Sequence, residues 1–407
     1  MAETAIKTQD GPKVQGPEKQ TILVGEQVYL RALNDGDNAL GTSWRDTIFP
    51  QSTSRVESWV GEHLAREDPE KKQTLAIVRR AGDLVVGSMV VEHDPTASFA
   101  KAHVDLVYGE AELAWKGEAL ALVVHWLVDE CHRLIVHVDL PASESPAIAA
   151  IEAAGMRQTA RFREKRFVAG SWVDELVYDY ANPAWVARLG DPMGIELPRT
   201  GTGEPRPVPA KVSLAGDPPR GSVMVGERVY LRPYEKKDAD DLVRWDMRET
   251  DTFHTLGRGA QSPSAISREI LAPQKDALPD NVLLMVCLRE NDTVIGHVEL
   301  ADIDYVNRNA ETGSWLARAD YRGGGYGSEA KQLLLAYAFD RLRLHMVHSW
   351  VLFHNTRSAA ALRKQGYREA GRANWLFAHE GKLGNMVLFD LLADEWRAMP
   401  RMTASEA

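Results

Sequence analysis

A glycine-rich run in the second half of the chain holds the residues best suited to chemistry. It reads Tyr-Arg-Gly-Gly-Gly-Tyr-Gly-Ser-Glu-Ala over residues 321–330, between a strand-like segment (311–316) and a helical one (330–339). Glycines let the backbone approach a ligand and turn its N–H groups inward, and the following helix adds unpaired amides and the positive end of its dipole. The run therefore predicts an anion site that favours a phosphorylated cofactor, with a tight turn as the alternative.

Two well-known phosphate loops do not describe this run. The sequence has no G-x-x-x-x-G-K-[ST], and the acidic residue of a dinucleotide fingerprint would have to come from Asp340, inside the following helix. The pattern [QR]-x-x-G-x-[GA] fits better, through Arg322, Gly325 and Gly327. In this the run resembles the acyl-CoA pyrophosphate loop of the GNAT superfamily of N-acetyltransferases.

The elements around the run occur twice in the chain. Residues 24–31 recur almost unchanged as 225–232, and further on an offset of 211 residues aligns Glu118 with Glu329 and Gly155 with Gly366. Such a constant offset predicts a tandem duplication. We expect a disordered tail (1–20), a first domain (21–189), a proline- and glycine-rich linker (190–222) and a second domain (223–400).

Each copy shows the same order of strands and helices, typical of an α/β (α+β) fold. In the second copy we expect strands at 229–232, 282–289, 293–301, 312–317 and 345–352, helices at 237–248, 330–339 and 358–364, and a hairpin around residues 380–381. The resemblance implies tandem GNAT domains, each a mixed, mostly antiparallel sheet flanked by helices. Val-Tyr-Leu-Arg-Pro (229–233), Asn-Thr-Arg-Ser (355–358) and Lys-Gln-Gly-Tyr (364–367) place it near the ribosomal-protein N-terminal acetyltransferase branch, which is RimJ/RimL-like.

The resemblance implies acetyl-CoA as co-substrate, held in a V-shaped opening between the fourth and fifth strands. Backbone amides of the run would hold its diphosphate, strand residues would bond the pantetheine arm, and an asparagine after the fifth strand could also bond it or could be an ordinary helix cap. The cofactor-binding candidates are Ser314, Trp315, Leu316, Arg322, Gly323, Gly324, Gly325, Tyr326, Gly327, Ser328 and Asn355.

Acetyl transfer also needs a route for the amine proton and an acid for the departing thiolate. Glu311 stands where related enzymes often carry a carboxylate base, and its alternative is a solvated strand-edge glutamate. Many members of the superfamily have a tyrosine acid seven residues after the asparagine, but this chain has Leu362 there. Ser358 is the candidate acid instead, unless it only caps a helix.

The first copy has lost these features. At the offset of 211 residues, Glu110 to Gly117 replace the glycine run, and Glu144 and Ala147 replace Asn355 and Ser358. Glutamates where phosphates would lie repel them, by about 3–4 kcal/mol per charge pair at 4–6 Å and an effective dielectric near 20. We expect a non-catalytic first domain and one active site, in the second.

Bulk properties narrow the function classes. The net charge of −10 disfavours nucleic acid as a partner, and the two cysteines have no metal-ligand spacing and indicate a reducing cytoplasm. No apolar run is long enough to cross a membrane. The expected function is acetyl-CoA-dependent N-acetyltransfer to a primary amine, on a small molecule or a protein N-terminus, without a metal and with homo-oligomers allowed. The alternatives are an acyl-CoA-binding sensor without turnover and an acyltransferase that uses another donor such as succinyl-CoA.

Overall fold

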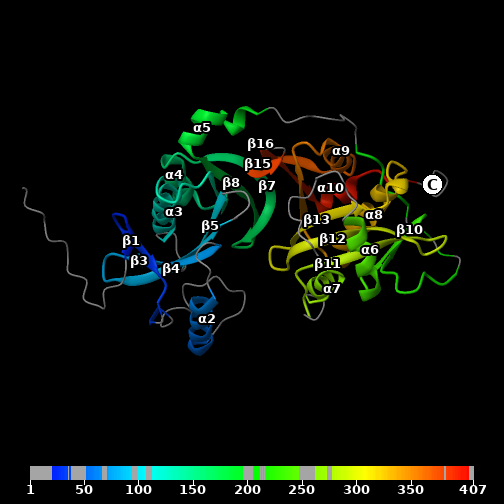
Figure 1. Ribbon diagram of the computed structural model, residues 1–407, viewed down its shortest axis with the longest axis horizontal. Coiled ribbons are helices and arrows are strands. Elements are labelled where there is room, and N and C mark those ends of the chain that lie inside the picture. Colours follow the sequence, from blue (N-terminus) through cyan, green and yellow to red (C-terminus); the bar gives the residue numbers. More distant parts are fainter. Residues whose placement is uncertain are drawn as a thin grey trace, which may run out of the picture. The chain divides into compact units, whose positions relative to one another are not determined.

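The protein is represented by a computed structural model in which the chain forms two compact units (Figure 1). The first contains residues 1–138, 144–157 and 180–183, and the second 139–143, 158–179 and 184–407. The structure describes residues 21–34, 36–37, 52–66, 71–93, 99–106, 112–195, 205–210, 212, 214, 216–246, 262–272, 277–379 and 382–402. The predicted tail lies outside these residues.

The first unit contains a sheet whose strands β1 to β6 lie in chain order. Its strands pair antiparallel except β5 and β6, which pair in parallel from Phe99–Ile135 to Ala102–Val138. The strands are β1 (Thr21–Val24), β2 (Val28–Ala32), β3 (Lys72–Arg79), β4 (Leu84–His93), β5 (Phe99–Leu106) and β6 (Ile135–Pro141), and the helices are α2 (Thr53–Arg66), α3 (Glu112–Asp129) and α4 (Ser145–Ala153).

The second unit has strand order β8-β7-β15-β16-β14-β13-β12-β11-β10-β9. The strands are β7 (Arg157–Val168), β8 (Ser171–Ala181), β9 (Met224–Val225), β10 (Val229–Pro233), β11 (Val282–Leu288), β12 (Val294–Asp304), β13 (Asn309–Leu316), β14 (Met346–Leu352), β15 (Arg368–His379) and β16 (Lys382–Leu392). The α-helices are α5 (Pro183–Leu189), α6 (Ala239–Asp246), α7 (Pro263–Leu271), α8 (Tyr326–Ala336), α9 (Thr356–Lys364) and α10 (Ala393–Ala398). Short 3₁₀ turns lie at Pro192–Gly194, Lys236–Asp238 and Ala319–Tyr321, and a π-helical turn at Tyr337–Arg341 continues α8.

Strands β13 and β14 separate part of the way along their length. Their parallel pairing runs from Asn309–Met346 to Glu311–His348 and ends there, although the strands continue to Leu316 and Leu352. At the point of separation the Thr312 hydroxyl donates to the His348 carbonyl (3.1 Å), and the Ser349 hydroxyl donates to the Thr312 carbonyl (2.9 Å). Side chains thus replace the backbone ladder, and the sheet opens as the resemblance implies.

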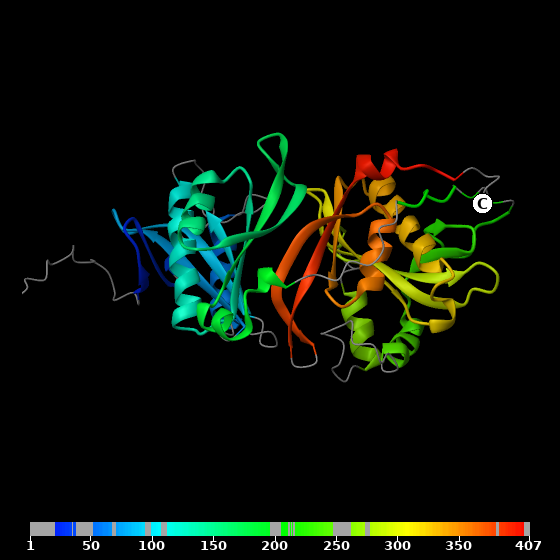
Figure 2. The ribbon, with the colours of Figure 1, turned by 90° about the horizontal axis from the view of Figure 1, so that it is seen from above.

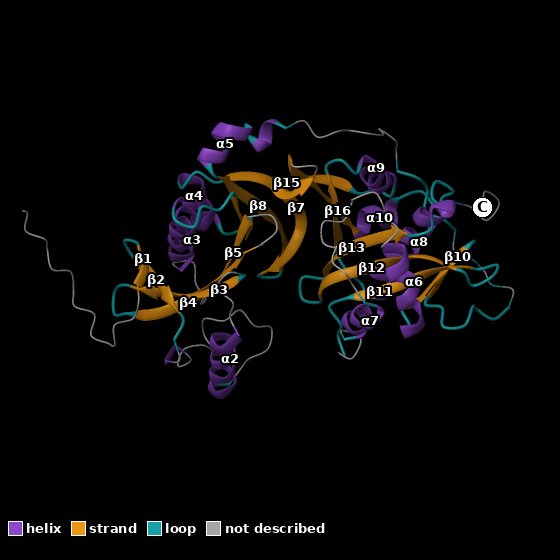
Figure 3. Ribbon diagram, in the orientation of Figure 1, coloured by secondary structure: helices purple, strands orange, loops and turns teal. Residues whose placement is uncertain are grey.

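The two faces of this sheet are covered by different helices (Figures 2 and 3). One face packs against α8 and α9 through a core that includes Val286, Val298, Leu334 and Leu335. The other packs against α6 and α7 through the cluster Tyr230, Tyr234, Leu242, Met285 and Cys287. Alternation along β11 explains the division, because Val286 faces one core while Met285 and Cys287 face the other.

The hairpin of β7 and β8 belongs to the second unit although its sequence lies within the predicted first domain. Strand β7 pairs with β15 at Ala160–Gly371. The Arg163 guanidinium binds the carboxylate of Asp390, which is 1% exposed, and also donates to Glu395 at 2.7 Å. The compact units therefore divide the chain differently from the repeats in its sequence.

Several contacts recur at equivalent positions of the two units. Arg31 donates to Asp37 at 2.6 and 2.7 Å, and Arg232 donates to Asp238 at 2.7 and 2.8 Å. In each unit these buried side chains tie the end of a strand to the turn that follows. The recurrence supports the predicted duplication.

Helix α8 begins four residues earlier than the sequence pattern indicated. Gly325, at φ +87°, is its N-cap, so Tyr326, Gly327 and Ser328 form the first helical turn. The helical pattern began at Ala330 because the glycines before it mask the start of a helix. The amides of this first turn therefore point along the helix axis toward its N-terminal end.

Candidate functional site

The glycine run forms a tight turn between β13 and α8. Gly323 and Gly325 have φ of +84° and +87°, a region that side chains with a Cβ rarely adopt. Gly325 brings no side chain to cap the helix, so no side chain of the N-cap residue occupies the first-turn amides. The Arg322 Nε donates to the Leu316 carbonyl (2.8 Å), which fixes the turn against the end of β13. The turn therefore presents a helix N-terminus and a guanidinium side by side.

Two residues of the run have structural contacts instead. The Gly324 carbonyl accepts a hydrogen bond from the Arg228 guanidinium (2.9 Å), and the same guanidinium lies 4.5 Å from the Tyr326 ring centroid. Arg228 also donates to the buried carboxylate of Glu329 (2.9 Å). These contacts fix the turn through Arg228. Neither Gly324 nor Tyr326 lines the cavity described next.

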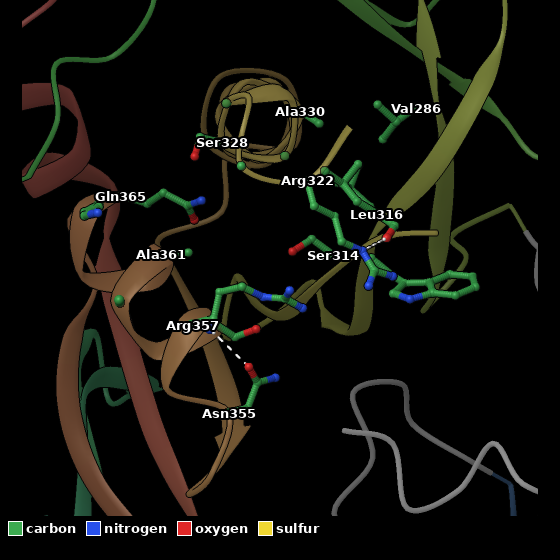
Figure 4. Close-up of a pocket in the computed structure, with 18 of the residues that line it drawn as sticks. Val286, Ser314, Leu316, Arg322, Ser328, Ala330, Asn355, Arg357, Ala361 and Gln365 are labelled. Atoms are coloured by element: carbon green, nitrogen blue, oxygen red, sulfur yellow. Dashed lines mark hydrogen bonds between the residues drawn. The ribbon is translucent and has the colours of Figure 1, made fainter. Parts of the chain in front are cut away.

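A cavity of about 390 Å³ lies between the turn, β13 and α9. We call it the cationic cavity, because four cationic side chains and no carboxylate are among its described lining residues. Figure 4 shows Arg322 and Arg357 entering it from opposite walls. The lining consists of Arg206, Val286, His297, Val298, Ser314, Trp315, Leu316, Arg322, Gly323, Gly325, Gly327, Ser328, Ala330, Asn355, Arg357, Ser358, Ala360, Ala361, Lys364 and Gln365.

A second cavity, of about 190 Å³, adjoins the first where β13 and β14 separate. The two share His297, Ser314, Trp315, Asn355, Ser358, Ala361 and Gln365. We call this one the acidic cavity, because Glu299 and Glu311 line it; Lys331 is its single Lys or Arg lining residue among those described. The structure thus brings the predicted residues Glu311, Ser314, Ser358 and Asn355 around one continuous space.

Glu311 is the last residue of β13 that pairs with β14. Its Oε1 accepts a hydrogen bond from the Trp350 indole N–H (2.8 Å). Burial raises the pKa of this carboxyl to about 7, and the negative charges of Asp302 and Glu299 add to the effect. A carboxyl with this pKa holds and releases a proton near neutral pH, which suits a general base. The predicted alternative, a solvated strand-edge glutamate, does not describe this side chain, because Glu311 is half-buried, pairs with β14 and accepts a hydrogen bond from Trp350.

Lys331 was not anticipated from the sequence. It lies in the middle of α8, is 1% exposed, and has its Nζ 5.9 Å from the ring centroid of Tyr367. Burial lowers the pKa of this lysine to about 7, although the charges of Glu299 and Glu311 act in the opposite direction. A charged side chain within an apolar helical stretch was the only available signal, and the site places it in the acidic cavity.

Asn355 and Ser358 begin α9 at the junction of the two cavities. The Asn355 side-chain oxygen accepts from the Ser358 N–H (3.1 Å), so Asn355 is the helix N-cap. The hydrogen bond from the cap therefore involves the backbone N–H of Ser358 and not its side chain. The side-chain NH₂ of Asn355 can still donate to a ligand. Ser358 is among the residues that line both cavities.

The equivalent region of the first unit has different contacts. Helix α3 begins at Glu112, so its first three residues replace Gly323, Gly324 and Gly325 at the offset of 211 residues. Gly117, which corresponds to Ser328, lies so close to α4 that an added Cβ would be 2.6 Å from the Ala150 Cβ. Lys116 forms an ion pair with Glu144 at 2.7 Å, with side-chain exposures of 11% and 18%. Glu110 and Ala111 lie outside the described residues.

Metal sites and membrane-spanning helices can be assessed for the part of the chain that the structure describes. There, no group of three or more His, Cys, Asp or Glu side chains is arranged to hold a metal ion. None of the helices there combines the length and the apolar character needed to cross a bilayer.

Comparison with known proteins identifies related sequences. The acetyltransferase (GNAT) domain profile matches residues 228–368. A putative ribosomal N-acetyltransferase of Bacillus subtilis is 29% identical over 42% of this chain and 95% of its own length. An uncharacterized N-acetyltransferase of Bacillus licheniformis is 29% identical over 42% of this chain and 96% of its length. The crystal structure of a putative acetyltransferase from Sphaerobacter thermophilus is 34% identical over 39% of this chain and 96% of that chain, with a TM-score of 0.32.

Proposed function

Because the chain belongs to the GNAT family of acetyltransferases, we propose that its second unit binds acetyl-CoA in the cationic cavity and acetylates a primary amine. The amine enters through the acidic cavity. The observation that carries the proposal is the opposite charge of two adjoining cavities: Arg206, Arg322, Arg357 and Lys364 line one, while Glu299 and Glu311 line the other. An anionic thioester and a cationic amine would therefore meet where β13 and β14 separate.

The residues at the junction supply the proton transfers. The Glu311 carboxylate takes a proton from the ammonium and leaves a nucleophilic amine, which bonds to the acyl carbon as the carbon–sulfur bond breaks. The Ser358 hydroxyl gives a proton to the departing thiolate and regains one from the amine nitrogen or from water. The first-turn amides of α8 and the Arg322 guanidinium hold the diphosphate, which positions the thioester next to Glu311.

We propose that this is the only active site of the chain. The close approach of Gly117 to α4 and the Lys116–Glu144 ion pair support this, because they lie at positions that correspond to the lining of the cationic cavity. The residues corresponding to Asn355 and Ser358 are Glu144 and Ala147, which provide neither a neutral cap nor a hydroxyl.

A pair of variants at Gly323 tests the cofactor assignment. A Cβ added at Gly323 meets no atom within 4 Å, so Gly323→Glu and Gly323→Gln share the strain of a positive φ and differ by one charge. At this exposed position a like-charge pair costs about 1–3 kcal/mol, depending on the local dielectric. We expect Gly323→Glu to bind acetyl-CoA about 5- to 100-fold more weakly than Gly323→Gln in isothermal titration calorimetry. Equal affinities would contradict the assignment.

Turnover is a separate measurement. Release of CoA with a panel of primary amines, both small molecules and peptides with a free N-terminus, identifies an enzyme. Binding of acetyl-CoA without release of CoA across the panel would instead favour a sensor. Faster release with succinyl-CoA than with acetyl-CoA would correct the donor.

A further inference from the structure

The linker between the two repeats contributes to the second unit at one short segment. Residues 205–209 read Pro-Arg-Pro-Val-Pro, so within them only Arg206 and Val208 have a backbone N–H. Both are used: Arg206 donates to the Lys364 carbonyl (2.8 Å) and Val208 donates to the Pro400 carbonyl (2.8 Å). Val208 is 5% exposed and belongs to the main core of the unit.

This anchoring presents the Arg206 side chain to the cationic cavity. Val208 is buried in the core, whereas Arg206 is exposed and is one of the residues that line the cavity. The three prolines already restrict the backbone, so little conformational entropy is lost when the segment docks. The chain thus places Arg206 at the C-terminal end of α9, next to Lys364, and both residues line the cavity.

The cationic residues of the cavity come from different parts of the fold. Arg357 and Lys364 are seven residues apart on α9, about 10 Å along the helix axis. Arg322 and the N-terminus of α8 form the opposite wall, where the diphosphate is proposed to bind. Arg206 and Lys364 are joined by a backbone hydrogen bond at the other end of α9, and both line the same cavity.

We propose that Arg206, with Lys364, binds a phosphate monoester on the nucleoside of the acyl-CoA, apart from the diphosphate. This inference rests on the proposed function, because it assumes that acyl-CoA occupies the cationic cavity. It makes the linker part of the cofactor site rather than a passive connection. Arg206 selects the fully phosphorylated donor from analogues that lack this phosphate.

The test compares two ligands and three proteins. Acetyl-CoA and 3′-dephospho-acetyl-CoA are titrated into the full-length chain, Arg206→Ala and Arg220→Ala, the last being an exposed linker arginine outside the lining of both cavities. Loss of one charge-assisted contact to phosphate predicts about tenfold weaker binding of acetyl-CoA by Arg206→Ala. Binding of the dephosphorylated analogue should change less than twofold, and Arg220→Ala should match the unmodified chain with both ligands.

The outcomes separate this inference from the proposed function. If Arg206→Ala weakens both ligands equally, the residue supports only the shape of the site, and the inference is overturned. If it weakens neither, Arg206 does not contact the ligand, and the inference is again overturned. If the unmodified chain binds neither thioester, the proposed function itself fails.

Discussion

Replacing Lys331 by methionine should stabilise the protein, and the gain should depend on pH. Methionine keeps most of the length and packing of the side chain but removes an ammonium that is 1% exposed. Burial lowers the pKa of Lys331 from 10.5 to about 7, because the charged form loses its hydration. The folded state therefore binds this proton less readily than the unfolded state, and folding costs free energy wherever the lysine must be charged.

The magnitude follows from the difference in pKa. A pKa lower by about 3.5 units corresponds to roughly 5 kcal/mol at 1.36 kcal/mol per unit, present in full below pH 7. Between pH 7 and 10.5 the unfolded state holds more protons, so the unmodified protein regains stability as the pH rises. The advantage of Lys331→Met should therefore decrease by about 3 kcal/mol between pH 6 and pH 9. Glu311 also reduces the advantage of the variant as the pH rises, because its carboxylate form has no cationic neighbour at position 331 in Lys331→Met.

Urea unfolding at several pH values measures this difference. The comparison of Lys331→Met with the unmodified chain at each pH cancels the titration of groups that the substitution does not affect. Lys236→Met, at an exposed position, is the control and should shift stability by less than about 0.5 kcal/mol at every pH. A free-energy difference for Lys331→Met that does not change with pH, or a destabilisation at pH 6, would refute the reasoning.

Three further substitutions test the site and the fold. Glu311→Gln should lower kcat/KM by about 10²–10⁴-fold. It should also abolish the rise of kcat/KM with pH through about 7, because only the carboxylate form accepts the amine proton. A retained rise in the pH–rate profile would exclude this base. Ser358→Ala should lower kcat by about tenfold or more. The midpoint of thermal unfolding should stay within a few degrees, since the Asn355 side chain bonds the backbone N–H at this position and not the hydroxyl. An unchanged kcat would mean that Ser358 only helps to begin the helix. Asp238→Ala should cost about 3–5 kcal/mol in urea unfolding because it leaves the Arg232 guanidinium buried without its carboxylate, and a cost below about 1 kcal/mol would contradict this.

The sequence predicted the parts of the site that depend on local backbone chemistry. Glycines at 323 and 325 indicate a turn in which the backbone can adopt a positive φ. The family resemblance, rather than any local pattern, implied a sheet flanked by helices, and the structure has helices on both faces of the sheet. The environment of Glu311 could not be read from sequence, because burial by Trp350 depends on the pairing of β13 with β14. For the same reason Lys331 was missed: helical periodicity places a residue on a face but does not say what that face covers.

The linker shows the same limit of local reasoning. Its proline content predicts a semi-extended chain without a core of its own, but residues 205–208 dock on α9 and on the segment after α10, and Val208 joins the core of the second unit. That docking depends on two backbone N–H groups meeting carbonyls that lie far away in the sequence. Composition alone therefore favoured a passive connection.

The position of the β7–β8 hairpin has a consequence for how the protein can be divided experimentally. A fragment that starts at the linker would contain the whole acetyltransferase sequence match, yet it would lack the hairpin that pairs with β15. Asp390 would lose Arg163, and one edge of β15 would be bared to other chains, which invites aggregation. The smallest soluble acetyltransferase fragment should therefore begin before Arg157, because a cut within the linker would divide a sheet of the second unit.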